Sequence, residues 1–429
     1  MSRMILPAWA ALAVCLVGAQ PAWAQTAAGD DDIAFAFGQA EATDVVEGDV
    51  EVEQDSEVLP AAFQDTIAPR APQLAARAPA RRSSSSAYQR LARVPNMFGD
   101  SLPPCGDVDI FQNLGEGGPT HTVAIPCPGG GGATKIAEND KALPVDRVFF
   151  YYNGFHNAFT IDSDDDSPGG VNDLNFHRYT IGFEKTFNEK QNSFEIRMPL
   201  TSGFDSSGDF DSFINTPGLE MGEVGNLAFV LKHVLWSTGY DVVALGLSFD
   251  VPTGDDVVVP IDFGDRLIMH NDAAHFAPFV GFLSVLSDRC FTQGFVQLGI
   301  PLAGNDIEFQ TDDDVDFADE SDFFDELKEQ NLLYLDLSLG YWLDRRWLAA
   351  VTELHYTTTL EDADDAEVFF GDYEFFSMAN RVDFLNLALG LHADVTENTN
   401  VRLAGVLPLR DGTDKPFDAE IQVSVNHYY

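Results

Sequence analysis

A regular alternation of apolar and polar positions begins near residue 146 and continues to residue 429. In NLLYLDLSLGYWL, residues 331–343, leucines and Tyr341 take one set of alternate positions, and Tyr334, Asp336, Ser338 and Gly340 take the other. FLNLALGLHAD, residues 384–394, repeats the pattern. A period of two is that of a β-strand whose two faces meet different environments. This part of the chain is therefore predicted to form two-faced strands.

The alternation divides into twelve strand-like runs. Most are close to the roughly 9–11 residues that a tilted strand needs to cross a bilayer. The runs cover 146–155, 175–187, 193–201, 224–236, 242–251, 273–286, 291–302, 331–343, 347–358, 383–393, 400–409 and 419–429.

The connections between these runs alternate between short and long. NEKQN, STGYD, SDRC, DRR and the TENT region are short turns, and a moderate connection covers 410–418. The long connections cover 156–174, 202–223, 252–272, 303–330 and 359–382. Short turns at one end and long loops at the other are typical of bacterial outer-membrane barrels, whose short turns face the periplasm.

Four runs end alike, at Pro199, Pro252, Pro301 and Pro408, with a glycine within four residues of each. Proline cannot donate a hydrogen bond to a central strand ladder, so it marks the place where a strand leaves the sheet. All four prolines are expected at one rim.

We therefore predict an all-β fold: an antiparallel, up-and-down transmembrane β-barrel of about twelve strands at 141–429. Its last strand, AEIQVSVNHYY, would pair with the first, DRVFFYYNGF, and leave no open edge. The alternative is a soluble sandwich or lipocalin-like barrel. It is disfavoured because the polar faces mix small residues with isolated charges of both signs. Tyr429, on the lipid-facing side, resembles the signal that the barrel assembly machinery reads.

The part of the chain before the predicted barrel divides into three segments that differ in composition. Residues 1–24 are predicted to be an export signal, with an A-x-A cleavage site at 22–24. Residues 25–95 are predicted to be a disordered periplasmic arm, first acidic and then Arg-rich. The Arg-rich half is either a solvated linker or a contact for cell-wall polymer. Residues 96–140, rich in Gly and Pro, are an irregular segment and a candidate plug.

The chain has 69 acidic residues against 24 Lys and Arg, which gives a net charge of −45 over 429 residues. This balance argues against a nucleic-acid partner and favours cations or a saline exterior. The long loops contain many of the acidic residues. These residues are either simply exposed to solvent or bind Ca²⁺, although their spacing is not that of an EF-hand. The candidate Ca²⁺ ligands are Asp164, Asp165, Asp166, Asp312, Asp313 and Asp314.

Two cysteines, Cys105 and Cys127, lie in loop-like sequence of a chain predicted to be exported. They either form a disulfide or remain two free thiols.

The polar faces of the predicted strands carry charges that would point into the barrel. Two interpretations remain open: salt bridges that fill a narrow interior, or a lining that selects solutes. Pairing the apolar residues around NEKQN predicts Glu184 opposite Arg197 and Phe187 opposite Phe194. The predicted lumen-lining residues are Arg178, Glu184, Glu195, Arg197, Lys232, Asp250, Asp336, Glu353, His355, His392 and Arg402.

No catalytic site is predicted. His355 with Glu353, and His156 beside an acidic loop, lack an identifiable nucleophile. Apart from Ca²⁺ in the loops, no cofactor is expected.

The segment LGLSFDVPTGDD, residues 245–256, resembles a strand end of the outer-membrane family of the phenol meta-pathway transporter type. The resemblance implies a barrel in outer-membrane lipid that takes up small molecules through its wall or lumen. The predicted function is thus a passive channel or transporter for small solutes. The alternative is a structural or adhesive barrel that binds cations or cell-wall polymer.

Overall fold

The structure is a computed structural model. It describes residues 83–100, 104–112, 120–131, 134–163, 172–201, 204–206, 219–221, 224–260, 266–310, 324–345, 347–361, 367–370, 373–378 and 381–429. The predicted export signal and most of the predicted arm lie outside these residues. No helix of the described part is long and apolar enough to span a membrane.

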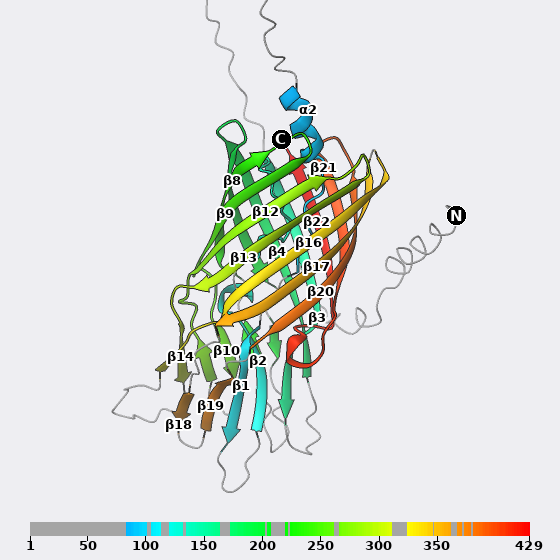
Figure 1. The fold of residues 1–429 in the computed structure, drawn as a ribbon. Coiled ribbons are helices and arrows are strands. Elements are labelled where there is room, and N and C mark those ends of the chain that lie inside the picture. The colour runs from blue at the N-terminus through cyan, green and yellow to red at the C-terminus, as the bar shows by residue number, and fades with distance from the viewer. Residues whose placement is uncertain are drawn as a thin grey trace, which may run out of the picture. The chain divides into compact units, whose positions relative to one another are not determined.

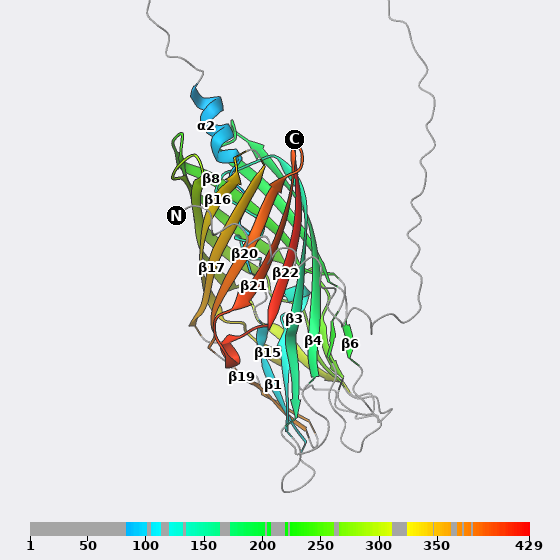
Figure 2. The ribbon, with the colours of Figure 1, turned by 90° about the vertical axis from the view of Figure 1, so that its right-hand side faces the viewer.

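Twelve antiparallel strands form a closed ring, which confirms the predicted barrel (Figures 1 and 2). The ring closes where the last strand pairs with the first, from Ala419 opposite His156 to Tyr428 opposite Arg147. The ring strands are β3 (Arg147–Ser163), β4 (Asn172–Phe187), β5 (Asn192–Thr201), β8 (Leu227–Ser237), β9 (Asp241–Val251), β12 (His275–Val285), β13 (Cys290–Pro301), β16 (Asn331–Asp344), β17 (Leu348–Glu361), β20 (Asp383–Asp394), β21 (Thr399–Pro408) and β22 (Ala419–Tyr428).

The two ends of the barrel differ as the connections predicted. Short turns join β4 to β5, β8 to β9, β12 to β13, β16 to β17 and β20 to β21 at one end, where the chain also terminates (Figure 1). Pro199, Pro301 and Pro408 lie in the last three residues of β5, β13 and β21, and Pro252 directly follows β9. These positions are all at the long-loop end, where the ladders stop.

The long connections and the segment before β3 carry further strands that the sequence analysis did not predict. Four of them extend the ring beyond β3 in the order β18-β19-β1-β2-β3, and six others form a second sheet in the order β15-β14-β11-β10-β7-β6. The first group is β1 (Pro104–Gln112), β2 (Thr120–Pro126), β18 (Glu367–Phe370) and β19 (Tyr373–Met378). The second is β6 (Phe204–Ser206), β7 (Leu219–Met221), β10 (Val257–Pro260), β11 (Arg266–Met269), β14 (Asn305–Gln310) and β15 (Phe324–Leu327). Three short helical segments complete the described elements: α2 (Ser83–Ala92), α3 (Pro128–Gly131) and η2 (Gly412–Asp414).

The outside of the ring is apolar and the inside is polar. In β16, Leu335, Leu337 and Leu339 are 38–58% exposed, whereas Asp336 and Ser338 are at most 4% exposed. A water-soluble barrel would show the opposite arrangement. Large aromatic side chains are exposed near the short-turn end, as in the girdle of a membrane barrel. They are Trp236, Tyr240, Tyr341, Trp347 and Tyr429. This exterior is built to contact lipid.

An arginine on the outward face should therefore be costly only where lipid surrounds the barrel. Leu337→Arg places a charge in the middle of β16, and we expect it to destabilise the barrel by about 2–4 kcal/mol. Val395→Arg, in an exposed short turn, is the control and should change stability by at most about 1 kcal/mol. Urea unfolding of both variants in lipid bilayers measures the difference. Equal effects of the two substitutions would contradict a lipid-facing exterior.

Candidate functional site: the filled lumen

All eleven predicted lumen residues lie on the inward face of their strands, and each is at most 5% exposed. They lie on eight of the ring strands: β4, β5, β8, β9, β16, β17, β20 and β21. All eleven side chains are buried on the enclosed side of the ring. Their partners, however, come largely from a segment of the chain that precedes the barrel.

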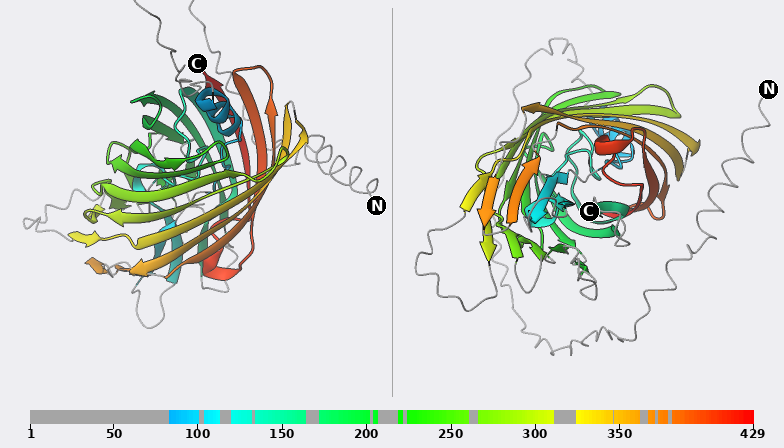
Figure 3. Two further views of the ribbon diagram at one scale, coloured as in Figure 1. Left: turned by 45° about the horizontal axis from the view of Figure 1, so that its top comes forward. Right: turned by 90° about the horizontal axis from the view of Figure 1, so that it is seen from below.

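The N-terminal part of the described chain passes through the lumen and returns through it (Figure 3). Helix α2 lies at the short-turn mouth, where Arg90 and Arg93 donate hydrogen bonds to the carbonyl groups of Gly239 and Arg345 in two short turns. Residues 95–100 then run inside the ring, β1 and β2 form a hairpin at the long-loop end, and residues 134–145 run back inside. We call residues 95–100 and 134–145 the plug.

The first half of the plug contacts the wall formed by the later strands. The backbone amides of Phe98 and Gly99 donate to Glu353 Oε2 at 2.8 and 3.0 Å. Gln293 and Gln422 donate to the carbonyl groups of Pro95 and Gly99. Backbone groups that a lumen segment cannot pair in a ladder are thereby satisfied by side chains of the wall.

Asp140 of the plug lies at the centre of a buried ion cluster. Lys232, Arg147 and Arg197 approach its carboxylate at 2.6, 3.2 and 3.4 Å. Arg147 also contacts Glu184 and Glu195, both at 2.8 Å. None of these six side chains is more than 1% exposed. We call them the Asp140 cluster: Asp140, Arg147, Glu184, Glu195, Arg197 and Lys232.

The predicted register of the β4–β5 hairpin, which carries two members of the cluster, was wrong. Glu184 lies opposite Glu195 rather than Arg197, and Phe187 lies opposite Asn192 rather than Phe194. The turn is shorter than predicted because Asn188, Glu189 and Lys190 all adopt positive φ. Two glutamates directly opposite would repel, but the guanidinium of Arg147 lies between them and binds both.

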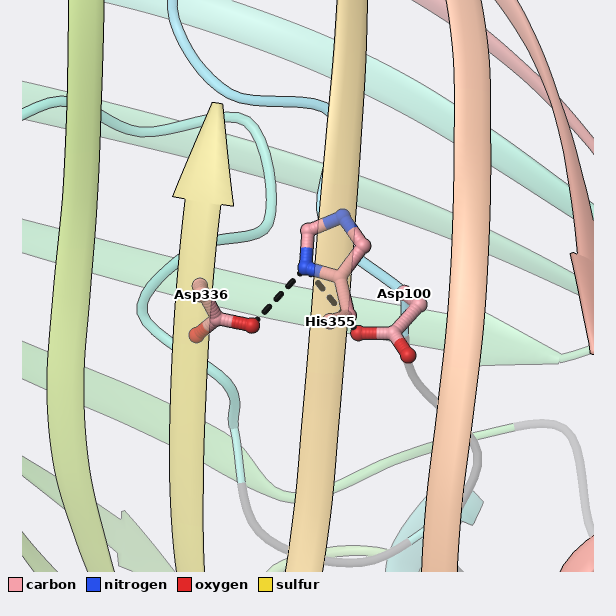
Figure 4. Close-up of side chains that lie close together, drawn as sticks. All are labelled: Asp100, Asp336 and His355. Atoms are coloured by element: carbon pink, nitrogen blue, oxygen red, sulfur yellow. Dashed lines mark hydrogen bonds and ion pairs between the residues drawn. The ribbon is translucent and has the colours of Figure 1, made fainter. Parts of the chain in front are cut away.

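A second cluster joins both passes of the plug to β16 and β17, and Figure 4 shows three of its side chains, Asp100, Asp336 and His355. Lys135 contacts Asp100, and its Nζ lies 2.8 Å from Asp336. His355 Nδ1 lies 2.8 Å from Asp336 and 3.5 Å from Asp100, and its Nε2 lies 3.2 Å from Glu353. We call Asp100, Lys135, Asp336, Glu353 and His355 the Asp100 cluster.

The two clusters favour ion pairing over metal binding or catalysis. Three side chains in each cluster lie close enough together to share a metal ion: Asp100, Asp336 and His355 in one, and Asp140, Glu184 and Glu195 in the other. Lys135 occupies that position in one, and Arg147 with Lys232 in the other. His355 has carboxylates at both ring nitrogens rather than a hydroxyl or thiol. A nucleophile–base pair would need the latter.

The remaining predicted site residues fall into three groups. Cys127 is disulfide-bonded and Cys290 is a free thiol. The side chain of Cys105 lies outside the described residues, so its pairing stays a prediction, although β1 and β2 place Pro104 opposite Pro126. The six candidate Ca²⁺ ligands also lie outside the described residues. Tyr429 is 52% exposed, and its ring stacks on Phe183 outside the barrel.

A further group of titratable side chains lies at the second sheet, outside the lumen. His270 follows β11, and its two nitrogens lie 3.1 Å from Asp256 and 3.0 Å from Glu308 of β14. Partial burial opposes the charged form of the ring. The hydrogen bonds and charges of Glu308 and Asp256 outweigh that effect and raise the pKa of His270. The same hydrogen bond outweighs partial burial at Glu308 and lowers the pKa of this carboxyl.

The closed ring, with its apolar exterior and charged interior, defines a transmembrane β-barrel. No family model and no curated protein matches the chain. Among solved structures it is similar to an outer-membrane channel from Pseudomonas putida F1, with 11% identity and a TM-score of 0.43 over 67% of this chain and 97% of that one. It is also similar to a mutant of the TodX monoaromatic hydrocarbon channel, with 8% identity and a TM-score of 0.38 over 67% and 91%. A third similar structure is the KdgM porin in complex with oligogalacturonate, with 7% identity and a TM-score of 0.34 over 66% of this chain and 99% of that one. These values assign no family, substrate or activity to the chain.

Removing the central anion of the Asp140 cluster should be strongly destabilising. Asp140→Asn leaves three buried cations without this partner, and we expect a loss of about 3–5 kcal/mol. Asp411→Asn, in an exposed loop, is the matched control and should change stability by less than about 0.5 kcal/mol. Equilibrium unfolding in detergent or lipid gives both values. A loss below about 1 kcal/mol for Asp140→Asn would show that the cluster does not hold the plug.

The His270 contact should stabilise the second sheet only within a window of pH. A raised histidine pKa adds stability that is complete below the ordinary value of about 6.5 and is lost as the pH rises through the folded value. The lowered pKa of Glu308 adds stability that is complete above about 4.3 and is lost at lower pH. Protection of the β11 and β14 amides from hydrogen exchange should therefore be greatest between these values. His270→Asn should make it independent of pH, and a wild-type profile that is already flat would contradict the contact.

Proposed function

We propose that the protein is an outer-membrane channel for small solutes, with its short turns and N-terminal arm in the periplasm. The observation that carries the proposal is the two-sided ring: apolar side chains outside and eleven predicted charged or histidine side chains buried inside. Lipid solvates the first face, and only a polar interior can accommodate the second. A ring of twelve strands encloses more space than the filled eight-stranded barrels and less than the open porins.

The plug supports a narrow channel rather than an open pore. Its two passes contact β4, β8, β13, β17 and β22 through hydrogen bonds. Solutes therefore pass beside the plug or after a shift of part of it. This arrangement favours small solutes and low conductance, and the buried charges favour a hydrated path over an apolar one.

Conductance of the full-length protein tests the proposal directly. In planar lipid bilayers we expect discrete steps that are several-fold smaller than those of an open porin measured in the same salt. Detergent without protein and the heat-denatured protein are the controls. Membranes that stay silent at every voltage, with folded protein shown to be inserted, would overturn the channel.

The filled lumen also supports a second candidate, a structural or adhesive barrel that is closed inside. Here the Arg-rich arm would bind cell-wall polymer, and the acidic loops, with Asp164–Asp166 and Asp312–Asp314, would bind Ca²⁺. Binding of the full chain to isolated peptidoglycan should then be lost when residues 66–95 are deleted and kept when 25–65 are deleted. In both candidates we propose that the assembly machinery recognises Tyr429.

A further inference from the structure

The walls of the lumen differ in how completely their carboxylates are paired. On the wall formed by β3, β4, β5 and β8, both oxygens of Glu184 accept hydrogen bonds, from Lys232 and Arg147. Both oxygens of Glu195 also accept hydrogen bonds, from Arg197 and Arg147. This wall is joined to the plug by the Asp140 cluster and leaves neither glutamate half-paired.

The wall formed by β16, β17, β20, β21 and β22 is different. Asp336, Glu353 and Glu420 each use one carboxylate oxygen, and the other oxygen is buried without a hydrogen-bond partner among the described residues. Smaller polar atoms on the same strands share this condition. They include Ser338 Oγ, Asn386 Oδ1, His392 Nδ1 and Ser424 Oγ; polar atoms of this kind also occur on the first wall, at Asn153 Oδ1 and Ser193 Oγ, so the contrast between the walls lies in their carboxylates.

Arg402 of β21 adds a half-paired cation to the same wall. Its Nη1 donates to Asn139 of the plug at 2.8 Å, while Nε and Nη2 have no partner among the described residues. The charge of Glu353 acts on it, yet the two form no ion pair within the described part of the chain. The side chain is 1% exposed. A guanidinium buried to this extent would normally pair with a carboxylate or with another hydrogen-bond acceptor.

Phe98 of the plug contacts both of these charges. Its ring lies over Arg402, 4.1 Å from the guanidinium carbon, and its amide donates to Glu353. The ring fits because Gly390 of β20 has no side chain: a Cβ there would lie 2.3 Å from the ring. Phe98 is thus the plug residue at which a small displacement would uncover an anion and a cation together.

Buried polar atoms without protein partners are normally satisfied by water. We propose that solutes pass between the plug and the β16–β22 wall, past Asp336, Glu353, Arg402 and Glu420, with Phe98 at the constriction. This inference rests on the proposed channel function and specifies its substrate class. Lone carboxylate oxygens and guanidinium nitrogens favour small hydrophilic solutes and ions, whereas an apolar solute would leave all of them unpaired.

Cysteine accessibility tests the route without requiring conductance. In the full chain carrying Cys290→Ser, we introduce Ala388→Cys or Ala404→Cys on the proposed route and Ala228→Cys or Ala244→Cys on the opposite side. All four alanines are inward and at most 4% exposed, so the substitutions are matched. Small charged methanethiosulfonates should modify the first pair at least tenfold faster, and Phe98→Ala should accelerate that pair alone. Equal rates, or faster labelling of the second pair, would overturn the route.

Conductance then separates this inference from the proposed function. In a KCl gradient, Arg402→Gln should shift the reversal potential towards cation selectivity and Glu353→Gln towards anion selectivity. Arg410→Gln, at the partly exposed rim, is the control and should cause a smaller shift. Silent membranes with asymmetric labelling would refute the channel but keep the hydrated route. Conductance with symmetric labelling and no opposite shifts would refute the route alone.

Discussion

Everything in this structure depends on the pairing of β22 with β3. Lipid offers no hydrogen bonds to the backbone, so an antiparallel sheet can lie in a bilayer only if its first and last strands satisfy each other. The register from Ala419–His156 to Tyr428–Arg147 achieves this. Closure then divides every strand into a lipid face and an enclosed face, and the enclosed face needs partners for its charges.

The plug supplies those partners, and it supplies them unevenly. Asp140 balances the cations of β3, β5 and β8, so that side of the interior is a nearly complete ion network. Lys135 and the Phe98 and Gly99 amides reach the other side but leave one oxygen of each carboxylate unpaired. Burial of charge is tolerated only where pairing is good. The pairing of buried carboxylates is therefore more complete on one side of the lumen than on the other.

Alternation of apolar and polar residues predicted the ring strands and the face on which each residue lies, and little else could be predicted from the sequence. A period of two gives the side on which a residue lies, so twelve strands and the inward position of residues such as Lys232 and Glu353 followed from it. It does not give contacts between distant segments. Asn139 with Arg402, or Lys135 with Asp336, join positions more than 190 residues apart, and no local pattern encodes them. The short strands of the second sheet, such as β10 with four residues, are too brief to show a period. The β4–β5 register failed because three left-handed turn residues shortened the loop.

The course of the N-terminal segment has a consequence for how the molecule is made. Helix α2 is bound at the short-turn mouth. At the opposite end, the β1–β2 hairpin pairs with β19 through β1 and with β3 through β2. A hairpin that pairs with a strand on each side is poorly suited to being threaded through a finished ring. A ring that forms around a segment already in place avoids this threading, so we expect β22 to pair with β3 only after the plug has entered the lumen. Once β22 has paired with β3, the plug is enclosed by the ring and cannot leave without opening it.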